Sequence, residues 1–136
     1  MRQGPERPRR LRRRIVLAAL GAAPLAAPAL AQQRDLSGTW RLTKSDSYVL
    51  VLSLTQQDDR IAGRVRIAGC PEGADCRQVP NDRVSGSVAG EQVEFQRTNP
   101  ELRHPQEFRG RLEGEDLVRG DFRHAGTPFG TFTMVR

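Results

Sequence analysis

The sequence contains few of the residues that build metal sites and nucleophilic active sites. Its 136 residues include two cysteines and two histidines. A structural metal site needs about four ligands at set spacings, which two thiols and two scattered histidines do not provide. His104 and His124 lie beside predicted turns, and neither accompanies a recognisable nucleophile motif. We therefore expect surface histidines, no metal, no cofactor and no catalytic residue.

A hydrophobic run long enough to cross a membrane is also missing. The longest apolar stretch, residues 15–27, contains Pro24 and falls short of the roughly 20 residues that a spanning helix needs. Seven arginines precede it, and Ala29-Leu30-Ala31 follows it. This three-part layout predicts a secretory signal, residues 1–31, rather than a retained anchor, and a periplasmic or secreted product. Arg13-Arg14 leaves both the general and the twin-arginine export routes open.

An excess of positive charge is absent once this segment is set aside. The chain carries 22 basic and 16 acidic residues, a net charge of +6. Residues 1–31 hold seven of the basic residues and one of the acidic ones, which leaves fifteen of each in residues 32–136. A neutral domain offers no basic surface for nucleic acid, so we expect no nucleic-acid partner. Its 105 residues suit a single domain.

Helical periodicity is absent as well, and apolar residues recur at every second position. Turn-forming residues separate the alternating segments, and the short links favour antiparallel neighbours in an up-and-down meander. Eight such strands close most economically into a barrel, and the alternative is a sandwich. The fold class is therefore all-β. The predicted strands are 36–42, 48–55, 60–67, 83–88, 92–97, 107–113, 116–123 and 129–135.

Glycine is placed regularly within these strands. The pattern apolar-x-Gly-x-apolar occurs five times, and alternation puts each glycine on the apolar face. A glycine weakens a strand unless the backbone needs the space, so the pattern favours the tight coiling of a narrow barrel. The five glycines are Gly38, Gly63, Gly86, Gly110 and Gly120.

The two cysteines lie close together. Cys70 and Cys76 flank a segment of turn-forming residues. In an exported protein this spacing predicts a disulfide that closes a surface loop. The bond is expected to contribute about 2 kcal/mol by restricting the unfolded chain.

The first and last predicted strands resemble those of the calycin group, which comprises the lipocalins and avidins. Leu36-Ser-Gly-Thr-Trp40 is similar to the opening of these proteins, and residues 126–136 are similar to the avidin ending. The resemblance implies that Trp40 closes one end of the barrel and that Arg136 packs across its ring. Avidins enclose biotin with further tryptophans, and Trp40 is the only tryptophan here, so biotin binding is not implied.

The barrel interior and its open end are the candidate binding surfaces. An eight-stranded barrel is either filled by its side chains or holds one small ligand, and the sequence leaves both possibilities open. A non-enzymatic module for a small apolar or amphipathic ligand is our first hypothesis. The candidate ligand-binding residues are Tyr48, Leu52, Phe95, Phe108 and Phe122.

The second hypothesis is a protein-interaction module, such as an inhibitor of an exported protease or hydrolase. It would present the 70–76 loop and the 99–105 loop as a rigid surface on a filled barrel. An isomerase or hydrolase ranks third, because it would need a histidine or carboxylate buried in a cavity. The sequence does not define the oligomeric state.

Overall fold

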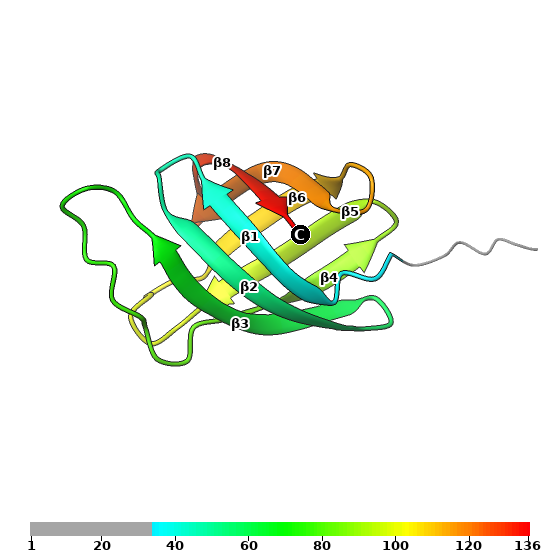
Figure 1. Ribbon diagram of the computed structural model, residues 1–136, viewed down its shortest axis with the longest axis horizontal. Helices are drawn as coiled ribbons and strands as arrows, with labels where there is room; N and C mark the ends of the chain where they lie inside the picture. Colours follow the sequence, from blue (N-terminus) through cyan, green and yellow to red (C-terminus); the bar gives the residue numbers. More distant parts are fainter. Residues whose placement is uncertain (1–33) are drawn as a thin grey trace, which may run out of the picture. The chain divides into compact units, whose positions relative to one another are not determined.

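Eight antiparallel strands form a closed barrel in the computed structural model, which describes residues 34–136 (Figure 1). Each strand pairs with the next along the chain, and β1 pairs with β8 to close the sheet. The predicted all-β, up-and-down barrel is therefore confirmed. The strands are β1 (Gly38–Lys44), β2 (Val49–Gln57), β3 (Arg60–Gly69), β4 (Arg83–Ala89), β5 (Gln92–Thr98), β6 (Gln106–Leu112), β7 (Leu117–His124) and β8 (Thr127–Val135).

The predicted signal segment, residues 1–31, lies outside the described residues. Across residues 34–136, no helix is long and apolar enough to span a membrane.

The strand ends differ from the predicted ones by at most two residues. Differences of two residues occur in four strands: β1 is shifted by two, β2 and β3 each end two residues later, and β8 starts at Thr127 rather than Phe129. The turn before β8 consists of Ala125 and Gly126, both with positive φ, as a two-residue hairpin requires. Pro128 enters the strand because a register shift beside Arg123 relieves the ladder at that point.

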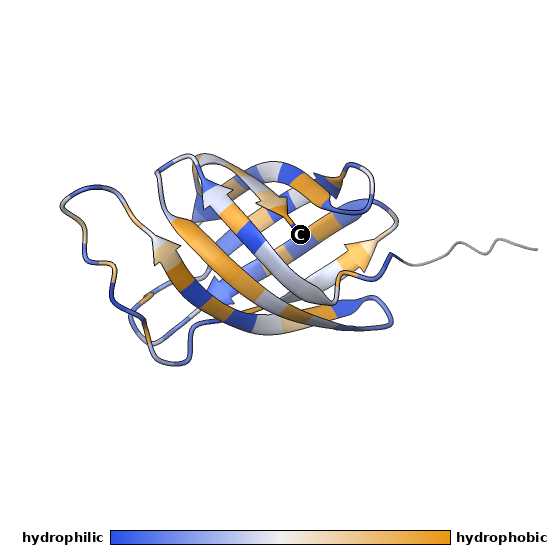
Figure 2. Ribbon diagram, viewed as in Figure 1, coloured by the Kyte–Doolittle hydropathy of each residue, from blue (hydrophilic) through white to orange (hydrophobic). Residues whose placement is uncertain are grey.

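The barrel interior is filled by apolar side chains. Orange and blue residues alternate along the strands in Figure 2, as expected for one inward and one outward face. The candidate residues Leu52, Phe95, Phe108 and Phe122 are all buried in this core. Arginines occupy many of the outward positions, and Arg109 pairs across strands with Glu94 at 3.1 Å. The described core is thus solid, and hollow space lies at one end of the barrel and on its outer walls.

Glycines on the inward face let neighbouring strands approach closely. A Cβ atom on Gly110 would lie 2.7 Å from the Cγ1 of Val118 and 2.8 Å from the carbonyl oxygen of Arg119. Gly110 faces Gly120 in the register between β6 and β7, where a Cβ on Gly120 would overlap the carbonyl of Arg109. The missing side chains of these glycines therefore leave room for the neighbouring backbone, and this close approach of the strands tightens the barrel.

Candidate functional site

The two ends of the barrel differ, and one of them is closed. Trp40 is fully buried there, and its indole nitrogen donates a 2.8 Å hydrogen bond to the carbonyl of Leu36. The guanidinium carbon of Arg136 lies 4.6 Å from the centre of the Trp40 ring. Arg136 also donates to the carbonyls of Asp35, Ser37 and Glu115. These contacts cover the indole, so a ligand has no route through this end.

The opposite end is open and contains a pocket of about 310 Å³. The strands β1, β3, β5 and β6 supply its walls, together with the β1–β2, β3–β4 and β5–β6 loops. Both apolar and charged side chains face it, including Ile67, Val79 and Leu102 on the apolar side. We call this pocket the mouth. Its volume lies at the lower limit of small-molecule sites, which span about 300–1,000 Å³.

A buried ion pair lies beneath the mouth. Arg97 donates two hydrogen bonds to Asp82, at 2.9 and 2.7 Å, and a third to Gln106 at 3.2 Å. Only 8% of the Arg97 side chain and 1% of the Asp82 side chain are exposed. Asn99 donates to the same carboxylate at 3.1 Å. A buried charge pair requires this degree of hydrogen bonding, because an unpaired charge there would be strongly destabilising.

Lys44 is the second buried cation at this end. It follows Trp40 and Leu42 on the inward face of β1, and its side chain is 3% exposed. Its Nζ atom lies 3.3 Å from the Oδ2 of Asp46, 4.7 Å from the centre of the Phe122 ring and 5.3 Å from that of Tyr48. Burial lowers the pKa of Lys44 below the ordinary value of 10.5, and the Asp46 carboxylate opposes part of this effect.

The loops around the mouth are fastened to one another. The Cys70–Cys76 disulfide is present and closes the first half of the β3–β4 loop, as the sequence predicts. Arg77 forms a two-point ion pair with Glu101 of the β5–β6 loop, at 2.9 and 3.1 Å, and also bonds Asp75 at 2.9 Å. The projecting loops in Figure 1 therefore form one linked wall.

Aromatic rings continue from the core to the rim of the open end. Phe108 stacks on Phe122 at 5.6 Å between ring centres, and Phe122 stacks on Phe129 at 6.3 Å. Phe129 is 59% exposed and meets the ring of His124 edge-on. The Nδ1 atom of His124 is buried without a hydrogen-bond partner. A smaller hollow of about 180 Å³ lies among these rings, and Asp46 and Gln106 line both it and the mouth.

A larger groove, about 550 Å³, lies on the outer wall of β3, β4, β5 and β6. Besides the buried Ile61, Phe95 and Phe108, its lining is mainly polar, and two of its exposed residues, Glu94 and Arg109, are already paired with each other. Exposed pairs of this kind attract ligands weakly in water. The mouth, with its buried cations and apolar walls, is the stronger candidate site.

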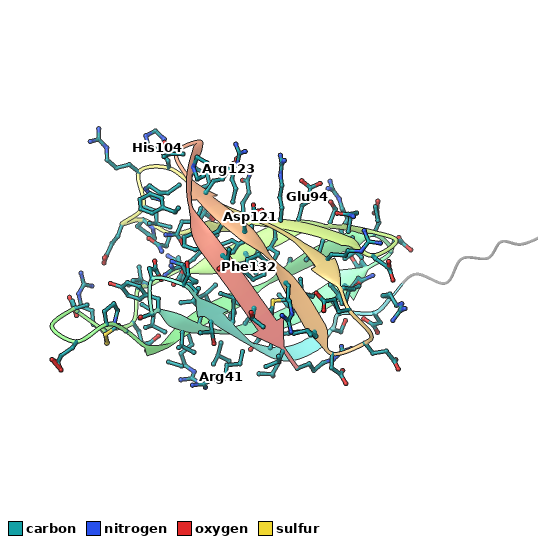
Figure 3. The ribbon with its side chains drawn as sticks, turned by 90° about the horizontal axis from the view of Figure 1, so that it is seen from above. Arg41, Glu94, His104, Asp121, Arg123 and Phe132 are labelled. Carbon is teal, nitrogen blue, oxygen red and sulfur yellow. A yellow bond between two sulfur atoms is a disulfide. The ribbon has the colours of Figure 1, made fainter. Side chains whose placement is uncertain are left out.

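The candidate residues separate into two groups in the structure. Tyr48 is half-buried and lines the mouth, whereas the other four candidate ligand-binding residues belong to the packed core. Both histidines lie near the open end. His104 is exposed on the β5–β6 loop, and Figure 3 shows it at the edge of the molecule, away from Phe132 in the interior.

Neither Lys44 nor Arg97 was among the site residues predicted from the sequence. A signal for both was present, because each continues an inward series, Trp40-x-Leu42-x-Lys44 and Val93-x-Phe95-x-Arg97. Lys44 is also the only lysine of the chain, whose other 21 basic residues are arginines.

No protein-family model, no curated protein and no solved structure matches the chain.

Proposed function

We propose that this protein is a calycin-like, non-enzymatic binding module that is exported and acts in the periplasm or outside the cell. It would take up one small amphipathic molecule at the mouth. A disulfide-fastened loop suits an oxidising compartment. The Trp40–Arg136 contact agrees with the arrangement that the calycin resemblance implies for the closed end.

The observation that carries the proposal is the pocket of about 310 Å³ at the open end. The core beneath it is solid, so a ligand would lie at the rim and contact Tyr48, Ile67 and Leu102 rather than enter the barrel. Fastened loops reduce the conformational entropy that is lost when a ligand binds. Paired charges next to apolar walls favour a molecule with both polar and apolar parts.

Native mass spectrometry on protein purified from its own source tests this function. We expect a retained small molecule, and we expect Tyr48→Ala to release it. The outward-facing Thr39→Ala, also on the barrel wall, serves as a matched control and should retain it. An empty barrel that co-purifies with another protein would contradict the proposal.

The alternative is a protein-interaction module, such as an inhibitor of an exported protease or hydrolase. One observation favours it: the Arg77–Glu101 bridge and the disulfide give the two loops a fixed relative position on a solid barrel. A rigid protruding surface is what a partner's cleft requires. Under this alternative, Glu101→Gln would weaken the complex with the partner, while the mouth would bind no small molecule.

A further inference from the structure

The choice of basic residues in this chain is unusual. Twenty-one of the 22 basic residues are arginines, and Lys44 is the single lysine. A guanidinium remains protonated in proteins, whereas an amine can lose its proton and act as a nucleophile. Lys44 is therefore the one side chain in the sequence that offers amine chemistry.

The position of Lys44 suits this chemistry. It lines the mouth, and its Nζ atom lies between the rings of Tyr48 and Phe122 with Asp46 at 3.3 Å. Burial lowers the pKa of the amine, which raises the fraction of the neutral, nucleophilic form. Asp46 is partly exposed and can accept the proton that the ammonium releases.

The charges of the mouth argue against an anionic ligand. Each of its three cations already has a carboxylate partner: Lys44 with Asp46, Arg97 with Asp82, and Arg77 with Asp75 and Glu101. An anion would have to compete with these carboxylates, and displacing Asp82, whose side chain is 1% exposed, would leave a buried charge unpaired, which is costly. A neutral molecule meets no such competition.

The rings at the rim indicate the shape of that molecule. Phe122 and Phe129 stack with an angle of 8° between their planes, and Phe129 remains largely exposed. Phe122 itself is buried, so the flat apolar faces at this end are those of the exposed Phe129 and the half-buried Tyr48, whose ring centre lies 5.3 Å from the amine. Such faces favour a planar, apolar body.

We propose that Lys44 is a covalent attachment site, which forms a reversible imine with the aldehyde group of a small neutral aryl or similarly planar ligand. This inference rests on the proposed binding function and names the ligand class of the same site. Asp46 first takes a proton from the Lys44 ammonium. The neutral amine then attacks the carbonyl carbon, and the electrons of the carbonyl π bond move to oxygen.

A proton passes from nitrogen to that oxygen, which gives a neutral carbinolamine. Asp46 then returns its proton to the hydroxyl, the carbon–oxygen bond breaks, and one water leaves as the carbon–nitrogen double bond forms. The product is a protonated imine beside the Asp46 carboxylate, so the original ion pair is restored. Nothing is oxidised or reduced.

Reductive trapping tests the inference. The full chain is incubated with 2-naphthaldehyde and sodium cyanoborohydride at neutral pH, and the adduct is located by peptide mass spectrometry. We expect one adduct on Lys44, formed about tenfold or more faster than on free Nα-acetyllysine amide, because the site holds the aldehyde beside an amine whose pKa is lowered by burial. The N-terminal amine, which lies on a different peptide, gives the rate of an unassisted amine on the same chain.

Three variants complete the test. Lys44→Arg and Lys44→Met should give no adduct at this position, and Asp46→Asn should keep the lysine but slow trapping several-fold. The emission of Trp40, which is far from the mouth, reports whether each variant is folded. An Asp46→Asn variant that reacts as fast as the wild type would overturn the role given to Asp46.

A non-covalent probe separates this inference from the proposed function. The alcohol 2-naphthalenemethanol has the same planar body and no carbonyl, so its binding, measured by calorimetry, reports on the mouth alone. If the alcohol binds and the aldehyde is trapped no faster than on free lysine, the imine is overturned and the binding function stands. If neither compound interacts with the protein, both fail.

Discussion

Asp82 and Arg97, fifteen residues apart, form a two-point ion pair inside the open end of the barrel, with bonds of 2.7 and 2.9 Å. Neither side chain has more than 8% of its surface exposed. Asn99 and Gln106 complete the hydrogen bonding. The pair thus joins β5 to the end of the β3–β4 loop and supports the floor of the mouth from below.

Removal of one member of this pair should be strongly destabilising. We expect Asp82→Asn to lower the free energy of unfolding by about 3–5 kcal/mol, because it leaves the Arg97 charge buried without a counter-charge. Urea denaturation measures the effect. Glu94→Gln removes one member of the exposed pair with Arg109 and should cost less than about 1 kcal/mol. Equal costs for the two variants would contradict this account.

The Arg136–Trp40 contact can be tested through the only tryptophan of the chain. Arg136→Ala should lower stability by about 1–2 kcal/mol through loss of the cation–π contact and its hydrogen bonds. It should also shift the emission of Trp40 to longer wavelength, because water reaches the uncovered indole. Arg41→Ala, which removes an exposed side chain from the same strand as Trp40, should leave the emission unchanged. No shift in the Arg136 variant would show that other groups cover the ring.

The close approach of strands at Gly110 predicts a penalty for any side chain there. Gly110→Ala should destabilise the barrel by about 2–3 kcal/mol, because the added methyl group overlaps Val118 and the carbonyl of Arg119. Thermal unfolding followed by circular dichroism measures the change. Ser85→Ala, on an outward position of β4, should be nearly neutral. A stable Gly110→Ala variant would mean that the glycines do not set the barrel's curvature.

The lowered pKa of Lys44 predicts that the stability of the protein depends on pH in the alkaline range. This pKa is lower in the folded protein than in the unfolded chain, chiefly through burial, with opposition from Asp46. The unfolded state therefore binds more protons in the interval just below 10.5, and stability should rise with pH there. Asp46, Arg97 and Asp82 are the other charged groups that act on the amine.

The measurement compares urea denaturation of the wild type and Lys44→Met across this interval. The increase in stability with pH should be smaller in the variant by the contribution of the lysine. The same pair of measurements in a Tyr48→Phe background removes the neighbouring phenol from the comparison. A parallel pH dependence in wild type and variant would contradict the lowered pKa.

The architecture could be predicted from the sequence because alternation and short turns are local signals. All eight strands were found, and inward residues such as Leu52 and Phe108 are buried. The boundary of β8 was wrong by two residues, because a bulge beside Arg123 accommodates Pro128, which local rules place in a turn. Bulges depend on the partner strand, and a single strand does not show them.

The mouth was harder to predict than the fold. An inward charge such as Arg97 is acceptable only because Asp82 lies opposite, and that partner belongs to a loop fifteen residues away. The same applies to Lys44, whose surroundings include Phe122 of a distant strand. Tyr48 was identified because it stands beside a polar segment at the start of a strand. Contacts that close the barrel ends are long-range, and a pattern within one strand does not contain them.

The junction between β1 and β8 has a consequence for the order of folding. The other strand pairs join neighbours along the chain, whereas this one joins residues such as Arg41 and Val135 across almost the whole barrel sequence. Its ladder holds four residue pairs, against nine between β2 and β3. Closing such a long loop costs the most chain entropy, so this junction forms last and opens first. Trp40 lies at one end of this junction and Lys44 at the other. Transient opening would therefore loosen both the Trp40–Arg136 contact at the closed end and the mouth at the open end.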